Sequence, residues 1–238
     1  MTIENNTYFW KEKPFSYPVC IPPIHKPFIE LSHNEAEAYF QWHLSVLQER
    51  IDVLSKEVAH KLQIPRERMD LSPVSLITLW EWFLSIIEIE ETPKARLDWF
   101  WKTDRHPKEI KEELLNGMKL QYSLETTLIF DDIGKYLGEV FVKNLPGVSW
   151  TYYEKPKRDF FVKMPVIQGF ADRHFSPPFK MYFEPVHMAG VQAAKIWDGR
   201  QQKTDLLDLY HHWASLYFPV DERDETGDGT VSHLIRHN

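Results

Sequence analysis

One segment of the sequence is apolar on nearly every side of the helix it would form. Residues 74–90 carry large apolar side chains at Leu76, Ile77, Leu79, Trp80, Trp82, Phe83, Leu84, Ile86 and Ile87. A helix of this kind has to be surrounded by other elements of the fold. Glu81 and Glu88 interrupt the segment, which falls short of the about 20 apolar residues that a bilayer span needs. The sequence therefore predicts a central helix in a globular protein and no membrane partner.

The rest of the chain can supply the surroundings of that helix. It has 238 residues, and 14% of them are aromatic, which excludes disorder for most of its length. Cys20 is the single cysteine, so an intramolecular disulfide is excluded, as is a zinc site built on cysteines. The first 13 residues show no signal-peptide pattern, and together with the lone cysteine they predict a cytoplasmic protein.

The charge of the chain narrows the choice of partners. Its formal net charge is −7, whereas nucleic-acid binding depends on lysine and arginine neutralising phosphates. The acidic balance argues against a nucleic-acid partner and suits a basic protein partner.

Clear start and stop signals predict a long helix before the central one. Ser32 and Glu35 form a capping box, and Pro65 ends the helix. Between them, Phe40–Leu62 carries apolar residues at alternating spacings of four and three, which form one seam. The seam fits either a homodimer interface or a place in the core, and the additional apolar residues beside it favour the core.

Further elements follow along the chain. Ser72-Pro73 begins the central helix, which is expected to run to Glu90, and Pro107 opens a short helix that ends at Gly117. Ser123 begins another helix, which runs to about Asn144 and contains Gly134 and Gly138 on one face. Two glycines inside a helix indicate the close approach of another element.

The C-terminal half changes from helical spacing to strand composition. Val148–Tyr153 and Phe160–Val166 predict a hairpin, and Phe179–Phe183 predicts a third strand. Two helices follow, Val186–Trp197 and Leu206–Phe218. The expected fold class is α+β, helix-dominated, with a small antiparallel sheet in the C-terminal half.

Four regions are expected along the chain. Residues 1–30 form an extended proline-rich arm packed on the body, because each proline fixes its backbone and removes a donor. Residues 31–120 are helical, and residues 121–220 form an α+β module in one continuous core with them. Residues 221–238 form a mobile acidic tail.

The sequence carries no nucleophile, phosphate-loop or dinucleotide motif, so no catalytic residue and no cofactor are predicted. Asp131, Asp132 and Glu139 lie on one helix, and the alternative function is a metal- or carboxylate-dependent hydrolase that uses Asp132, Glu139 and histidines. The histidines considered for that role are His187, His211 and His212. Adjacent histidines on a helix point about 100° apart, so no metal site is predicted.

Basic residues gather around the expected hairpin, at Lys143, Lys155, Lys157, Arg158 and Lys163. With aromatic neighbours they fit either a single-strand nucleic-acid platform or an exposed hairpin that uses lysine to protect its edge. The overall acidity favours the exposed hairpin.

Three stretches carry a resemblance, namely Ile133–Val140, Asn144–Trp150 and Met164–Phe170. They resemble a module of uncharacterised bacterial proteins in which a Tyr-Leu-Gly-Glu helix leads to a strand bearing tryptophan, and some of these are similar to toxin-immunity proteins. The resemblance implies a bacterial protein that acts without catalysis by binding another protein, such as a basic toxin. The candidate binding residues are Asp132, Tyr136, Glu139, Trp150 and Tyr152.

The same stretches have an architectural interpretation. Gly134 and Gly138 would let the hairpin approach the helix, and Trp150 would cover the junction. Glu139 would accept hydrogen bonds from strand amides there.

Overall fold

The computed structural model describes residues 17–18, 20–24, 26–94, 97, 108, 112, 119–154 and 161–218. The chain divides into two compact units. The smaller combines residues 1–19 with 85–129, and the larger combines residues 20–84 with 130–238. The larger unit draws on both of the regions predicted at 31–120 and 121–220. The predicted acidic tail and most of the predicted arm lie outside the described residues.

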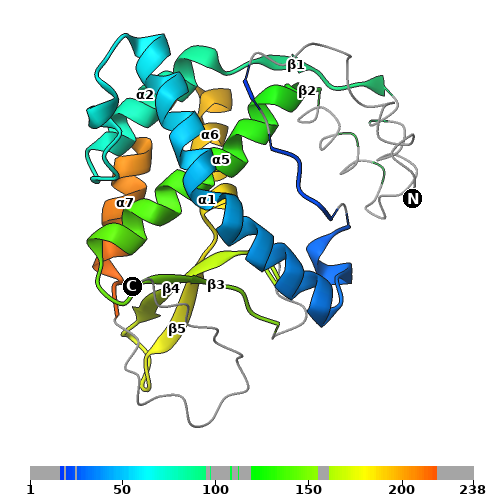
Figure 1. The fold of residues 1–238 in the computed structure, drawn as a ribbon. Coiled ribbons are helices and arrows are strands. Elements are labelled where there is room, and N and C mark those ends of the chain that lie inside the picture. Colours follow the sequence, from blue (N-terminus) through cyan, green and yellow to red (C-terminus); the bar gives the residue numbers. More distant parts are fainter. Residues whose placement is uncertain are drawn as a thin grey trace. The chain divides into compact units, whose positions relative to one another are not determined.

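Helix α1 (His33–Leu62) begins and ends as predicted (Figure 1). Ser32 Oγ accepts a hydrogen bond from the Glu35 amide at 3.3 Å, and Glu35 Oε2 accepts one from the Ser32 amide at 2.8 Å, which completes the capping box. Four residues of the seam are buried inside the larger unit, namely Phe40, Ile51, Leu54 and Val58. This burial favours the core interpretation of the seam, and the homodimer stays a prediction.

Helix α2 (Ser75–Ile86) is the central helix that the sequence predicts, with Leu76, Leu79, Trp80 and Phe83 fully buried. The predicted end at Glu90 is wrong, because residues 89–91 form strand β1 (Ile89–Glu91). This strand pairs antiparallel with β2 (Leu120–Tyr122). Residues 87–90 alternate isoleucine with glutamate, which is the period of a strand.

Helix α5 (Leu124–Asn144) follows β2 and confirms the helix expected from Ser123 to about Asn144. Ser123 Oγ accepts a hydrogen bond from the Thr126 amide at 3.2 Å. The short helix predicted between Pro107 and Gly117 lies outside the described residues, apart from positions 108 and 112.

A three-stranded antiparallel sheet belongs to the larger unit, in the order β3-β4-β5 (Figure 1). Its strands are β3 (Ser149–Thr151), β4 (Val166–Asp172) and β5 (Phe179–Phe183). The third strand has the predicted bounds, but the second begins only at Val166, because residues 161–164 form a turn. Lys163 has a φ of 66°, which belongs to a turn, and its amide bonds to Tyr153 O at 2.8 Å.

Two helices close the described chain. Helix α6 (Pro185–Ala193) continues as a 3-10 helix (Ala194–Asp198) that ends at Gly199, and α7 (Asp205–Ser215) follows. Shorter 3-10 helices lie at Phe28–Glu30 and Arg66–Arg68. The fold is therefore a helix-dominated α+β fold, as predicted.

Aromatic rings join the sheet to the helices. The Phe141 ring of α5 lies 4.9 Å from Phe183 of β5 and 4.8 Å from Tyr210 of α7 between centroids. Phe183 also lies 4.8 Å from Trp213 of α7. The core face of the sheet is thus covered by α5 and α7. Within the described part of the chain, every helix is too short or too polar to cross a bilayer.

Candidate functional site

The first predicted site residue, Asp132, lies in a buried ion pair between α5 and α1. Arg50 Nη2 donates to Asp132 Oδ2 at 2.5 Å, and Arg50 Nε donates to Oδ1 at 3.0 Å. The side chains are 6% and 3% exposed. A bidentate guanidinium–carboxylate pair satisfies both groups, so Asp132 fixes how the two helices cross. Although aspartate is usually a surface residue, Asp132 is therefore part of the interior of the larger unit.

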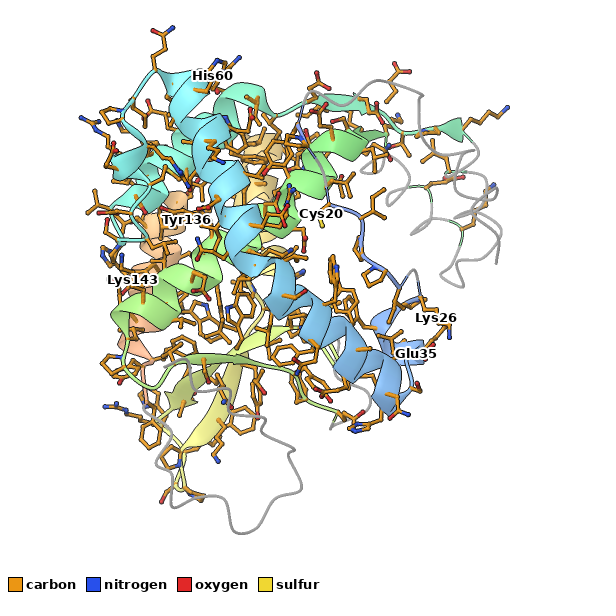
Figure 2. The ribbon with its side chains drawn as sticks, in the orientation of Figure 1. Cys20, Lys26, Glu35, His60, Tyr136 and Lys143 are labelled. Carbon is orange, nitrogen blue, oxygen red and sulfur yellow. The ribbon has the colours of Figure 1, made fainter. Side chains whose placement is uncertain are left out.

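Tyr136, labelled in Figure 2, holds the segment that leads into α2. Its hydroxyl donates to Ser75 Oγ at 2.7 Å and accepts from the Leu71 amide at 3.1 Å. Leu71 has a φ of 59°, a left-handed conformation that a leucine rarely adopts. Two neighbours on α5 also hold this segment, because Lys143 Nζ donates to Asp70 O at 2.6 Å and Asn144 Nδ2 to Leu71 O at 2.8 Å.

Glu139 and Trp150 form the junction between α5 and β3. Trp150 Nε1 donates to Glu139 Oε1 at 2.7 Å, so the carboxylate accepts from the indole of β3, and the expected bonds from strand amides stay a prediction. A Cβ on Gly138 would lie 2.2 Å from Trp150 Cζ2, which explains the glycine. The expectation for Gly134 is wrong in its partner, since a Cβ there would meet Val186 of α6 at 2.4 Å and not the hairpin.

Tyr152, the fifth predicted residue, is 4% exposed. Its hydroxyl donates to Glu37 Oε2 at 2.7 Å, and its ring lies 5.3 Å from Phe40 of α1. All five candidate residues thus have partners within the larger unit. Four of them are buried, and Glu139 is half-buried. The structure brings Glu139 and Trp150 together and gives the other three separate partners.

Sequence reasoning missed two buried polar residues on the apolar seam of α1, His43 and Arg50. His43 and Arg50 lie seven residues apart along the apolar seam, a spacing that places both on its face. His43 is buried against the Trp150 ring at 4.6 Å between centroids, and its Nε2 has no hydrogen-bond partner. Burial lowers the pKa of His43, so the imidazole is neutral. The sequence does contain a signal for buried polar contacts here, namely two polar residues inside an apolar seam.

Lys135 is a second buried charge that the sequence does not mark. Its side chain has no exposed surface, its ammonium donates to Asp131 one turn earlier, and it lies 5.8 Å from the centroid of the Trp42 ring. Half-buried Cys20 lies in the same unit, and burial raises the pKa of its thiol. A thiol of raised pKa is a poor nucleophile at neutral pH.

The basic patch predicted around the hairpin is only partly described. Lys143 and Lys163 are used within the fold, since Lys163 Nζ donates to Leu31 O and Lys143 to Asp70 O. Lys155, Lys157 and Arg158 lie outside the described residues. Among the described residues, no three histidine, cysteine or carboxylate side chains gather in a way that could hold a metal ion.

A different surface stands out between β4 and β5, and we call residues 173–180 the hairpin tip. Phe175 and Phe179 are 58% and 63% exposed, and their ring centroids lie 5.9 Å apart. Phe179 continues a row of side chains on one face of β5, in which Phe183 is fully buried and Met181 is half-buried. The apolar row therefore runs out of the core and ends in two exposed rings.

The hairpin tip is tied to the rest of the larger unit. Arg173 Nη2 donates to Tyr217 O at 2.8 Å, and its guanidinium lies 5.5 Å from the centroid of the Phe218 ring. The His174 amide donates to Asp172 Oδ1 at 2.9 Å. Pairing of β4 with β5 reaches Asp172 and Phe179, so the two rings project from a closed hairpin.

Comparison with known proteins adds no relative: no family model, no curated protein and no solved structure matches this chain. The resemblance of residues 132–170 to the bacterial module therefore stays a prediction.

Proposed function

We propose that the protein acts by binding another protein, and that the hairpin tip is its contact surface. The observation that carries this proposal is the exposed pair Phe175 and Phe179. Large aromatic side chains bury much area and dominate the energy of protein interfaces, and folds rarely leave them exposed side by side. The apolar row of β5 would be completed by a partner that covers the two rings.

The proposal treats the protein as non-catalytic, in keeping with the composition and motifs of the chain. Support comes from the partners of the carboxylates considered for hydrolysis. Asp132 is bound to Arg50, and Glu139 accepts from Trp150. His187 lies on α6, and His211 and His212 lie on α7 with exposed side chains. These contacts give the acidic residues an architectural role, and within the described ranges no three histidine, cysteine or carboxylate side chains gather to hold a metal ion.

An immunity-type function is a narrower form of the same proposal. It rests on the resemblance of the α5 segment to the bacterial module and on the net charge of −7, which suits a basic toxin. Co-expression with the product of the adjacent gene tests it. Rescue of growth together with a stable complex is expected, and a neighbour that neither binds nor is neutralised removes the immunity form while leaving protein binding in place.

Site-specific cross-linking tests the binding function itself. A photoreactive benzoylphenylalanine replaces Phe179 in one variant and Val74 in a control, since the two native side chains are exposed to similar extents, 63% and 66%. We expect one protein to be cross-linked from position 179 and not from 74, and the purified protein to bind the wild-type chain in a fixed ratio. Identical products from both positions, or none from 179, contradict the proposal.

A further inference from the structure

The side chains around the two exposed rings carry one sign of charge. Arg173, His174 and Lys180 are all exposed, and Arg173 and Lys180 are basic residues. Asp172, the acidic residue next to the tip in the chain, is half-buried and accepts the His174 amide. The hairpin tip is therefore locally basic, although the whole chain has a net charge of −7.

Local charge decides which partner fits this surface. Charges separated by more than about 8 Å are largely screened at physiological salt, so a partner seated on the tip responds most to the charges within that distance, which include Arg173 and Lys180. A basic surface placed there would meet like charges at close range, which strongly disfavours a complex, so even a toxin that is basic overall would have to meet the tip with an acidic patch.

We propose that the partner presents an apolar pocket for Phe175 and Phe179 with carboxylates at its rim. This inference rests on the proposed protein-binding function and gives it a partner chemistry. Arg173 is already held by Tyr217 O and the Phe218 ring, so its remaining donors stand in a fixed plane that matches a carboxylate. Lys180 follows Phe179 directly and places a second cation on the other face of β5.

A protein pocket suits this surface better than a lipid surface. Bilayer adsorption relies on several freely reaching cations and on apolar groups that enter the lipid, and each cation contributes little by itself. Here the arginine is fixed against its own unit, and the two rings are held 5.9 Å apart by a paired hairpin. A preorganised pair of rings loses little conformational entropy when it enters a complementary pocket.

Selection from a displayed library of random peptides tests the inference without knowledge of the natural partner. The wild-type chain is the target, and the double variant Phe175→Ser/Phe179→Ser is the counter-target. Lys180→Glu tests the charge, and Lys56→Glu, an exposed lysine of α1, makes the same charge change away from the tip. Circular dichroism and melting temperature confirm that each variant is folded.

The expected result is enrichment of acidic peptides with aromatic or large aliphatic residues. Their binding falls about tenfold or more on the double variant and on Lys180→Glu, weakens with added salt, and is unchanged on Lys56→Glu and on Val74→Ser. Basic or uncharged peptides that depend on the two rings overturn the partner chemistry and leave the binding function standing. Peptides that bind the double variant equally well, or no enrichment at all, overturn both.

Two direct measurements exclude the other occupants. Co-sedimentation with phosphatidylcholine vesicles, with and without phosphatidylglycerol, is expected to show no binding that depends on Phe175 and Phe179. Light scattering is expected to show the same mass for wild type and the double variant. Ring-dependent vesicle binding would assign the tip to a membrane, and a ring-dependent dimer would assign it to a second copy; either result overturns the inference.

Discussion

The α5 segment from Asp132 to Glu139 and the hairpin tip from Arg173 to Lys180 belong to the same compact unit but use their residues in opposite ways. In the α5 segment, every candidate side chain has a partner inside the unit: Arg50 for Asp132, Ser75 for Tyr136 and Trp150 for Glu139. At the tip, Phe175 and Phe179 contact each other and otherwise face solvent for more than half of their surface.

The difference between the two regions shows that a residue can be constrained either by packing within the fold or by contact with a partner. A helix needs a glycine where a large side chain packs against its backbone, and a buried charge needs a partner of opposite charge. Both requirements leave patterns that can be recognised in the sequence. An exposed ring satisfies no packing requirement in its own chain, so a pair of such rings indicates contact with another molecule. In this protein the most distinctive motif maintains the fold, and the surface available to a partner carries no motif.

The largest effect is expected where the α5 segment holds a buried charge. Arg50→Met removes the partner of Asp132, and an uncompensated buried carboxylate costs about 3–5 kcal/mol. Urea denaturation of the purified variant measures the loss. The double variant Arg50→Met/Asp132→Leu removes both charges and is expected to recover most of that stability. A single variant as stable as the wild type would show that the ion pair is not part of the architecture.

The close approach at Gly138 is expected to give the next largest effect. Gly138→Ala places a Cβ 2.2 Å from Trp150 and forces the indole away from Glu139, at a cost of about 2 kcal/mol, and Gly138→Leu costs more. Gly190→Ala on α6 is the matched control, since its Cβ meets nothing within 4 Å. That change is expected to stabilise the helix by up to about 1 kcal/mol. Thermal and urea unfolding compare the two, and equal effects would contradict the packing argument.

The unfolding free energy is expected to depend on pH because of Glu184, which caps α6. Burial raises the pKa of Glu184 from 4.5 to about 7, even though its carboxylate accepts the His187 amide. The folded protein therefore keeps this proton at pH values where the unfolded chain releases it, and the contribution of Glu184 to stability falls as the pH rises from about 4.5 to about 7.

The variant Glu184→Gln keeps an acceptor for the His187 amide and removes the titration. The difference in unfolding free energy between variant and wild type is expected to grow by roughly 1–3 kcal/mol across that pH window, in favour of the variant. Urea denaturation at several pH values measures it. Parallel pH profiles for the two proteins would show that Glu184 is not protonated in the fold.

The sequence predicts the elements of this fold better than their contacts. The capping box at Ser32 and the apolar segment after Pro73 locate α1 and α2, because both signals are local. The end of α2 is misplaced because the strand at Ile89–Glu91 depends on a partner about 30 residues away in the chain, at Leu120–Tyr122. Strand pairing of this kind leaves only a weak local pattern.

In the candidate site, too, the sequence predicts the elements better than the contacts between them. The glycines of α5 correctly indicate a close approach, yet the element that approaches Gly134 is α6, and the partner of Asp132 is an arginine 82 residues earlier. The exposure of Phe175 and Phe179 could not be inferred either, since phenylalanine is normally buried and Phe179 lies in a strand pattern that predicts a core position. Only the burial along β5 shows that the row leaves the core before its end.

The smallest effect on stability is expected at the hairpin tip, and it completes the comparison with the α5 segment. Phe175→Ser/Phe179→Ser removes two side chains that are mostly exposed, so the unfolding free energy should change by less than about 0.5 kcal/mol per substitution. The same double variant should lose the protein cross-linked from position 179. Urea unfolding and binding to that purified protein measure the two quantities separately.

Phe183 provides the contrast within the same strand and on the same face. It is fully buried between Phe141 and Trp213, so Phe183→Ser should cost at least about 3 kcal/mol, although the residue is far too buried to touch a partner. If the tip variant proves as destabilising as Phe183→Ser, the two rings belong to the core and have no binding role. If the tip variant stays stable and loses its partner, the two ends of the apolar row have different roles. Phe183 at the inner end stabilises the fold, and Phe179 at the outer end binds a partner, which then covers its exposed ring.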